Sequence, residues 1–317
     1  MTAKKIITVF GATGRQGGGM ARAVLADPDS GFTVRAVTRH PDSAPARELA
    51  RLGAEVVRAD LDDEASLGPA FEHAYGAFLV TNFWEHMSAE REKTQADTLS
   101  KAAAHAGIQH AIWSTLEDTR ECIPLDDDRM PTLQGSYKVP HFDAKAEADR
   151  YFTEEGVPTT FLRTTFYWEN LLGAFAPQRA DDGVVELVFP MGDKRLAGMA
   201  ADDIGRTALE IFKRDTDLIA ATVSIAGEFL SLPEMAAALT ESLGETVRYR
   251  PLTPDAFREL GFPGADEAGN MFQYYADCED RFTHARDLDA VRALNPALQD
   301  FRTWLAAHTD ELRLAWK

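Results

Sequence analysis

The stretch Val9-Phe10-Gly11-Ala12-Thr13-Gly14-Arg15-Gln16-Gly17-Gly18-Gly19 determines how the first part of this chain folds. It ends an apolar run, Ile6–Phe10, and precedes a helical pattern in which Met20 and Val24 are four residues apart. A glycine-rich turn between a strand and a helix is typical of dinucleotide sites, because free N–H groups at the helix start can hold a pyrophosphate. A flexible turn is the alternative. The context favours a dinucleotide, bound by Gly11, Ala12, Thr13, Gly14, Arg15, Gln16 and Gly17.

Three consecutive glycines, Gly17, Gly18 and Gly19, begin the expected helix. Each costs roughly 1 kcal/mol of helix stability relative to alanine, so the run needs a physical reason. Gly11 allows a tight turn and Gly14 lets the backbone approach a pyrophosphate. Gly17 lets the helix pack on the strand. We assign the cost of the run to the close approach of a ligand.

The first 165 residues alternate between apolar runs of strand length and helical patterns. Apolar strands separated by helices are typical of a parallel sheet that is covered on both faces. We therefore predict an α/β fold with a Rossmann-type, doubly wound parallel sheet of six βα units in residues 1–165. Its strands are expected at Ile6–Phe10, Phe32–Val37, Glu55–Val57, Ala77–Thr81, His110–Ser114 and Thr159–Arg163.

Residues 166–317 show a different pattern, which predicts a smaller α/β lobe. We expect this lobe to form one wall of a cleft at the carboxyl ends of the sheet, where doubly wound folds bind ligands. Its strands are expected at Val184–Phe189, Ile219–Ile225 and Thr246–Tyr249, and its helices at 202–213, 231–243, 265–277 and 298–311.

The chain has 317 residues, of which 45% are hydrophobic, and its formal net charge is −18. The hydrophobic share excludes a disordered chain, and the negative charge disfavours direct nucleic-acid binding. Residues 1–58 carry nine basic and five acidic side chains, a net +4, which indicates a small anionic ligand there or is due to chance. No long apolar run indicates a membrane span or a signal peptide, so we predict a cytoplasmic protein.

The two cysteines, Cys122 and Cys278, are too few to indicate a disulfide framework or a zinc site. Neither suggests a redox pair. Cys122 lies in Asp118–Gln134, which we expect to be a long surface loop whose acidic triplet, Asp126-Asp127-Asp128, is solvated. The histidines show no spacing typical of metal ligands, so no metal site is predicted.

The end of the second expected strand distinguishes between two forms of the cofactor. NAD sites place an Asp or Glu about 20 residues after the glycine loop, where it holds the ribose hydroxyls. Here the sequence is Val37-Thr38-Arg39-His40-Pro41, with no carboxylate before Asp42. Arg39 can hold a 2′-phosphate by a charge-assisted contact, although an ordinary surface arginine is the alternative. The sequence therefore predicts NADP(H).

Motifs along nearly the whole chain resemble the NmrA-like family of atypical short-chain dehydrogenase/reductases, including a member that senses NADPH. The Asp118–Gln134 loop departs from the family pattern by its greater length, so the resemblance implies no partner surface there. The matching motifs are Val9 to Gly18, Val37-Thr38-Arg39, Gly53-Ala54-Glu55-Val56-Val57, Val80-Thr81-Asn82-Phe83-Trp84-Glu85, His141-Phe142-Asp143-Ala144-Lys145, Tyr167-Trp168-Glu169-Asn170-Leu171-Leu172, Phe262-Pro263-Gly264-Ala265 and Asn270-Met271-Phe272.

The resemblance implies a cofactor site that extends along the carboxyl ends of the strands. It implies that Gly11 to Gln16 contact the pyrophosphate and that Arg39 contacts the 2′-phosphate. Core packing is the alternative for Tyr167 and Trp168, because aromatic residues after a strand are usually buried. The other implied contacts are Asp60 and Leu61 at the adenine, Thr81, Asn82 and Phe83 at the middle of the cofactor, Lys145 at the nicotinamide ribose, and Tyr167, Trp168, Glu169 and Asn170 near the nicotinamide.

The residues expected for catalysis depart from the pattern of active reductases. Short-chain reductases use a Tyr four residues before a Lys, so that both lie on one face of a helix. Here His141 precedes Lys145 at that spacing, and Tyr137 is separated from the helix by Pro140. The catalytic candidates are therefore His141, Lys145 and Ser114, the last at the end of the fifth strand. The alternative for His141 is a helix-start residue with a backbone partner.

Two functions are compatible with these residues. The first is a non-catalytic, NADP(H)-binding redox sensor that acts through a protein partner, with a homodimer as a further expectation. The second is an NADPH-dependent reductase of a quinone, imine or similar small acceptor. The altered Tyr position favours the sensor, because the usual proton donor is missing.

Overall fold

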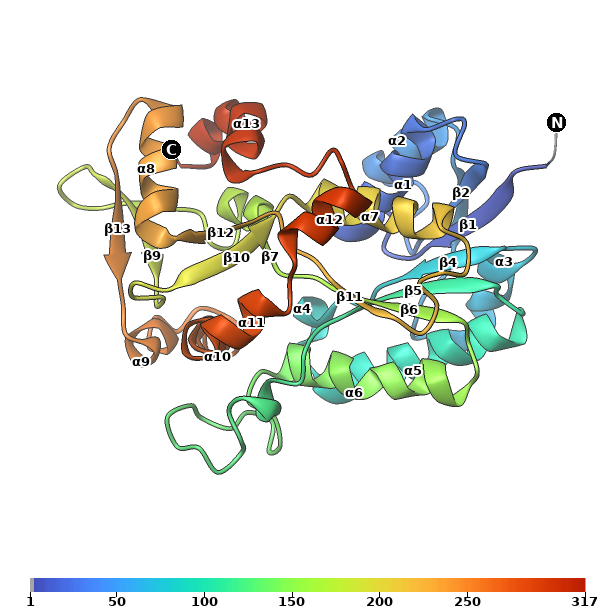
Figure 1. Cartoon of the computed structure of the whole chain (residues 1–317), viewed down its shortest axis with the longest axis horizontal. Helices are drawn as coiled ribbons and strands as arrows, with labels where there is room; N and C mark the ends of the chain where they lie inside the picture. The colour runs from blue at the N-terminus through green and yellow to red at the C-terminus, as the bar shows by residue number, and fades with distance from the viewer. Residues whose placement is uncertain (1–2, 317) are drawn as a thin grey trace.

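A seven-stranded parallel sheet forms the larger lobe of the computed structural model, which describes residues 3–316 (Figure 1). Its strands are β1 (Lys5–Val9), β2 (Phe32–Thr38), β3 (Glu55–Arg58), β4 (Gly76–Leu79), β5 (His110–Thr115), β6 (Thr159–Arg163) and β11 (Thr222–Ser224). Their order is β11-β6-β5-β4-β1-β2-β3, and every neighbouring pair is parallel. The predicted doubly wound α/β fold is confirmed, with one strand more than the six expected.

Helices cover both faces of this sheet (Figure 1). Their apolar sides pack on the strands in two separate core clusters, one on each face. On one face lie α1 (Arg15–Ala26), α2 (Ala44–Arg51), α7 (Ala201–Lys213) and α12 (Leu288–Leu294), and on the other α3 (Leu67–Phe71), α5 (Ala89–His105) and α6 (Pro140–Glu154). The short helix α4 (Phe83–His86) follows β4 at the carboxyl edge of the sheet.

Close packing around α1 explains the glycine run at its start. A methyl group on Gly17 would lie 2.4 Å from the carbonyl oxygen of Gly11, at the end of the preceding strand. A methyl group on Gly205, in α7, would lie 2.1 Å from the carbonyl carbon of Gly19. Close packing therefore accounts for Gly17 and Gly205, and the part of the cost that was assigned to ligand approach stays a prediction.

The smaller lobe has two three-stranded sheets. One contains β7 (Phe166–Tyr167), β10 (Arg195–Met199) and β12 (Glu228–Ser231), and the other β8 (Gln178–Arg179), β9 (Val185–Phe189) and β13 (Val247–Pro251). The helices of this lobe are α8 (Leu232–Leu243), α9 (Pro254–Arg258), α10 (Ala265–Asp277), α11 (Glu279–His284) and α13 (Phe301–Ala315). Three 3₁₀ turns complete the described elements at Glu64–Ser66, Thr119–Glu121 and Trp168–Leu172.

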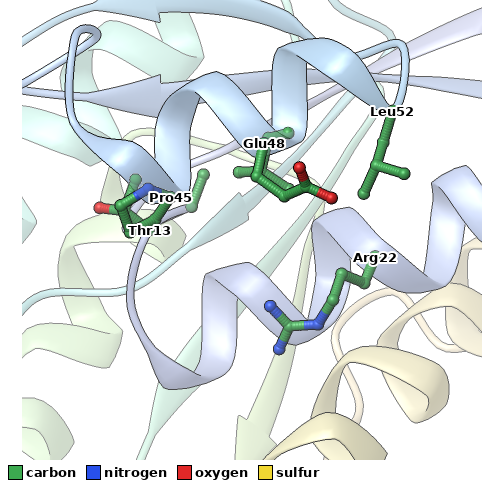
Figure 2. Close-up of a pocket in the computed structure, with 7 residues that line it drawn as sticks. Thr13, Arg22, Pro45, Glu48 and Leu52 are labelled. Carbon is green, nitrogen blue, oxygen red and sulfur yellow. The ribbon is translucent and has the colours of Figure 1, made fainter.

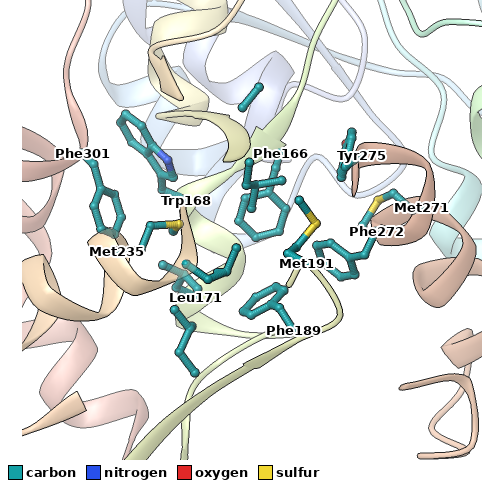
Figure 3. Packing of buried hydrophobic residues seen from close by; sticks show 14 of the residues in the cluster. Phe166, Trp168, Leu171, Phe189, Met191, Met235, Met271, Phe272, Tyr275 and Phe301 are labelled. Carbon is teal, nitrogen blue, oxygen red and sulfur yellow. The ribbon is translucent and has the colours of Figure 1, made fainter. Parts of the chain in front are cut away.

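One apolar cluster, rich in aromatic and methionine side chains, holds this lobe together (Figure 3). Phe189, Phe272 and Phe166 pack ring against ring, with centroids 4.9 Å apart for the first two. The chain passes between the lobes more than once. Although α7 and β11 follow residue 165, α7 packs on the large sheet and β11 is one of its strands. A division of domains at residue 165 stays a prediction.

Cys122 and Cys278 form a disulfide, with sulfur atoms 2.02 Å apart, a pairing that the number of cysteines had not indicated. The bond joins the Asp118–Gln134 loop to the end of α10, across 156 positions of sequence. Disulfides are rare in the reducing cytosol, so this bond argues against the predicted cytoplasmic location. No observation identifies the compartment directly, and the location stays a prediction. Among residues 3–316, no helix is long and apolar enough to cross a membrane.

Candidate functional site

A cavity of about 1120 Å³ runs along the carboxyl ends of the strands and into the smaller lobe. It brings together most of the residues that the sequence indicated, although they come from six separate segments. Those that line it are Gly11, Thr13, Gly14, Arg15, Gln16, Gly17, Arg39, Asp60, Leu61, Thr81, Asn82, Phe83, His141, Lys145, Tyr167 and Asn170.

Four indicated residues do not line this cavity. Ala12 borders a separate, smaller cavity of about 220 Å³ between α1 and α2, where Thr13 and Arg22 also lie (Figure 2). Trp168 is buried in the core of the smaller lobe against Phe301 (Figure 3). The remaining two, Glu169 and Ser114, are buried and fully engaged by neighbours.

Glu169 anchors two elements instead of facing the cavity. One carboxylate oxygen accepts a hydrogen bond from Trp304 Nε1 at 3.0 Å, and the other accepts from the backbone N–H of Ala201 at 2.9 Å. Burial raises the pKa of this carboxyl, although those hydrogen bonds oppose the rise. Core packing, the alternative weighed for Tyr167 and Trp168, holds for Trp168 only, because Tyr167 lines the cavity.

The glycine loop forms a cradle for an anion. Gly11 has a φ of +63°, a backbone conformation that glycine adopts without strain. Helix α1 begins after Gly14 without a side-chain cap and without an acidic residue in its first turn. Its first N–H groups lack partners within the helix and carry partial positive charge. This end of the cavity therefore fits a phosphate or pyrophosphate.

Arg39 lies at the end of β2, where it was predicted, but it already has a partner. Its guanidinium forms a forked ion pair with Glu85 of α4, with Nη2 2.9 Å from Oε2. Both side chains are about two-fifths exposed, at 43% and 41%, so the pair is open to solvent and to a ligand. A phosphate that binds Arg39 must compete with this carboxylate.

Lys145 is enclosed by a buried polar cluster at the end of β4. Its Nζ donates to Thr81 Oγ1 at 2.7 Å and lies 2.8 Å from Glu92 Oε1. The Thr81 hydroxyl in turn donates to Glu92 at 2.5 Å. Burial alone would raise the pKa of Glu92, but the charge of Lys145 and hydrogen bonds from His86, Lys145 and Thr81 lower it to about 2. Lys145 is thus held by protein groups at the cavity wall.

Gln16 connects two other candidates. Its Nε2 donates to the Tyr167 hydroxyl oxygen at 2.7 Å, and its Oε1 accepts from the Ser114 hydroxyl at 2.7 Å. Tyr167 also contacts Thr164 Oγ1 at 3.1 Å, and burial raises the pKa of its phenol to about 12. Ser114 is therefore a support for the loop rather than a free hydroxyl in the cavity.

His141 lies in the first turn of α6, and its partner is a carboxylate rather than only a backbone group. Glu267 of α10 accepts hydrogen bonds on Oε1 from His141 Nδ1 and from the His141 backbone N–H, the latter at 2.8 Å. The Trp84 and Phe142 rings flank the imidazole, with centroids 5.0 and 4.8 Å away. No sequence pattern indicated Glu267.

The far end of the cavity is an apolar chamber in the smaller lobe. The sequence pattern of α10 indicated core more often than a cleft wall for four residues on one helix face, Met271, Phe272, Tyr274 and Tyr275. All four pack in the core cluster of the smaller lobe, and Met271 and Tyr275 also line the cavity. Phe262, which also lines the chamber, belongs to one of the motifs of the family resemblance. Other chamber walls carry no motif and were missed; they include Phe175, Phe257 and Leu260.

Among the described residues, no group of three or more His, Cys, Asp or Glu side chains could hold a metal ion. The cavity instead combines an anion cradle, a row of polar groups along the strand ends and an apolar chamber. That arrangement suits a long anionic ligand and a second, apolar molecule next to it.

Curated relatives cover most of the chain. MalD of Malbranchea aurantiaca, an NmrA-like family domain-containing oxidoreductase, is 30% identical over 78% of this chain and 76% of its own. FrzB of a Cladobotryum species, which has the same description, is 29% identical over 85% of this chain and 83% of its own.

Solved structures share the fold. Nmra, a negative transcriptional regulator solved in complex with NAD, has a TM-score of 0.81 at 23% identity and covers 100% of this chain and 99% of its own. The Citrobacter sp. triphenylmethane reductase complexed with NADP(H) has a TM-score of 0.74 at 19% identity, over 96% and 99%. A family model described as NmrA-like family matches residues 3–304, and the chain therefore belongs to the NmrA-like family.

Proposed function

We propose that this protein is an NADP(H)-dependent reductase of apolar, aromatic acceptors. The observation that carries the proposal is the continuity of the cavity, which joins the glycine loop to the apolar chamber of the smaller lobe. Its volume, about 1120 Å³, exceeds the roughly 300–1,000 Å³ of a pocket for one small ligand. A cofactor and a second molecule can therefore be bound side by side.

The cofactor end of the proposal rests on the chain's own residues. The uncapped start of α1 would hold the pyrophosphate, and Arg39 would hold the 2′-phosphate. Tyr167 and Asn170 would lie beside the nicotinamide, which supplies a hydride when it is bound in reduced form. Nmra has been solved in complex with NADP as well as with NAD, on the same fold, which supports a dinucleotide here.

The side chains that line the chamber indicate which class of acceptor it can bind. The chamber walls include Phe175, Phe257, Phe262 and Met271, whose apolar surfaces favour an aromatic molecule over a sugar or a carboxylic acid. Closure of such a chamber around the acceptor would exclude water during hydride transfer. The relatives described as oxidoreductases support this assignment.

The sensor function, which the altered Tyr position favoured, stays a prediction, and so do its protein partner and the homodimer. A sensor needs a cofactor site and a surface that responds to it, but it does not need an apolar chamber at the nicotinamide end. That chamber is why we now favour the reductase.

Substrate-dependent oxidation of NADPH tests the proposal. We expect turnover of about 1 s⁻¹ or faster, in the usual enzyme range, with at least one member of a panel of aromatic quinones, aldehydes, imines and cationic dyes. Oxidation at the protein-free rate across the whole panel would support the sensor instead.

Cofactor selectivity should depend on Glu85 as well as on Arg39. We expect Glu85→Gln to tighten NADPH binding by about 2- to 5-fold, because an exposed ion pair of up to about 1 kcal/mol no longer competes with the 2′-phosphate. NADH binding should change much less, because NADH lacks that phosphate. Calorimetric titration of both cofactors gives the two affinities.

The exposed pair of Arg179 and Glu245, with exposures of 46% and 43%, provides a matched control. Glu245→Gln removes the same charge from an equally exposed arginine in the smaller lobe. It should leave both affinities unchanged. Weaker NADPH binding by Glu85→Gln would show that Glu85 supports Arg39 rather than competing for it.

A further inference from the structure

Glu267 of the smaller lobe holds the His141 ring of the larger lobe in one orientation. Glu267, only 4% exposed, binds both the Nδ1 side of the ring and the backbone N–H of the same residue. Because Glu267 fixes Nδ1, the other ring nitrogen, Nε2, is the one left for the cavity that His141 lines. Within residues 3–316, no protein group hydrogen bonds to Nε2.

The other catalytic candidates, and the Tyr167 phenol, are already engaged by protein groups. Lys145 donates to Thr81 and pairs with Glu92. The Ser114 hydroxyl donates to Gln16, and the Tyr167 phenol has a pKa of about 12. Of the three candidates that the sequence offered for catalysis, His141 alone presents a nitrogen to the cavity without a protein partner in the described chain.

We infer that His141 and Glu267 form a proton-donating dyad that replaces the usual Tyr, with His141 as the catalytic acid and Glu267 as its positioning residue. This inference rests on the proposed reductase function and assigns the group that completes the reduction. A carboxylate partner keeps a proton on Nδ1, so that Nε2 is the nitrogen that gives up its proton.

Reduction of a carbonyl acceptor requires one hydride and one proton. The carbonyl carbon receives a hydride, with its electron pair, from the reduced nicotinamide, and the π electrons of the C=O bond move to oxygen. The Nε2–H bond breaks as the proton bonds to that oxygen, which gives an alcohol and a neutral imidazole. The neutral ring still donates Nδ1–H to Glu267, and a proton from bulk solvent restores Nε2–H, so that each turnover consumes one hydride and one proton.

Two acceptors separate hydride transfer from proton transfer. An aromatic aldehyde needs both, whereas a cationic triarylmethyl dye becomes neutral on receiving hydride alone. We expect His141→Gln to lower kcat for the aldehyde about 100-fold, the lower end of the range for a general acid. The same variant should lower kcat for the dye far less. A solvent deuterium isotope effect should appear with the aldehyde and not with the dye.

Glu267→Gln should lower aldehyde turnover by about 10-fold or more, with little change in NADPH affinity, because the ring loses its fixed tautomer. Asp266, one residue away, carries an exposed carboxylate, and Asp266→Asn is the matched control. It should leave the turnover of both acceptors unchanged. In the protein without cofactor, proton NMR should show a slowly exchanging Nδ1 proton that is absent in His141→Gln and shifted in Glu267→Gln.

Equal losses on the aldehyde and the dye in His141→Gln would overturn the dyad while leaving the reductase in place. Failure of the unmodified protein to reduce either acceptor would remove the reductase, and the dyad with it. An Nδ1 proton that is unchanged in Glu267→Gln would overturn the positioning role of Glu267 independently of any turnover.

Discussion

Lys145→Met should cost about 3–5 kcal/mol of the free energy of unfolding, because it removes the ammonium from beside the buried Glu92 carboxylate and leaves only His86, with its Nε2 3.5 Å from Oε2, as a basic neighbour. Glu92 is 0% exposed and 2.8 Å from Lys145 Nζ, so water cannot replace the lost ammonium. Urea unfolding measures the loss. Lys101→Met, which breaks an exposed pair with Asp97, is the control and should cost less than about 1 kcal/mol.

A second substitution separates the charge from the packing. In Lys145→Met/Glu92→Gln the buried group is neutral, so about 1–3 kcal/mol of the loss should return. The pKa of Glu92 is about 2 against an ordinary 4.5, so its stabilising effect is present above pH 4.5 and is lost as the pH falls towards 2. The double variant should therefore lose less stability than the unmodified protein over that range. A single variant as stable as the unmodified protein would contradict the account.

Reduction of the Cys122–Cys278 disulfide should lower the free energy of unfolding by about 2–4 kcal/mol. The bond closes a loop of 156 positions, which strongly restricts the unfolded chain. The native fold should persist, because Asn270 Nδ2 still donates to the carbonyl oxygen of Pro131 at 2.9 Å and attaches the loop to α10.

Unfolding in urea with and without a reductant measures this loss, and a reductant should have no effect on Cys278→Ser. Thiol titration of the denatured, never-reduced protein should find no free thiol. Two reactive thiols per chain would contradict the pairing.

Local patterns explain what could be predicted from the sequence. The glycine loop, the apolar strands and the position of Pro140 each depend on neighbours within a few residues, so α1, the parallel sheet and the start of α6 followed from them. The spacing of His141 and Lys145 likewise placed both at the cavity. Arg39 was found because a strand end is a fixed position in this fold.

Contacts between distant segments could not be predicted in this way. Glu267 is 126 positions from His141, and Glu85 is 46 positions from Arg39, and neither pairing leaves a periodic signal in a single sequence. The close packing of Gly205 against α1 could not be predicted either, because an isolated glycine in a helix has many explanations. Strand β11 has only three residues, too few to show to which sheet it belongs.

Transfer of deuterium from labelled cofactor to acceptor tests the reductase most directly. NADPH carrying deuterium on one face of nicotinamide C4, and separately on the other, is mixed with the protein and an aromatic acceptor that supports turnover in the panel, and the product is analysed by mass spectrometry. A single binding geometry in the cavity predicts that the label reaches the product from one face only. Product without label from either face, or no product above the protein-free control, would contradict the account.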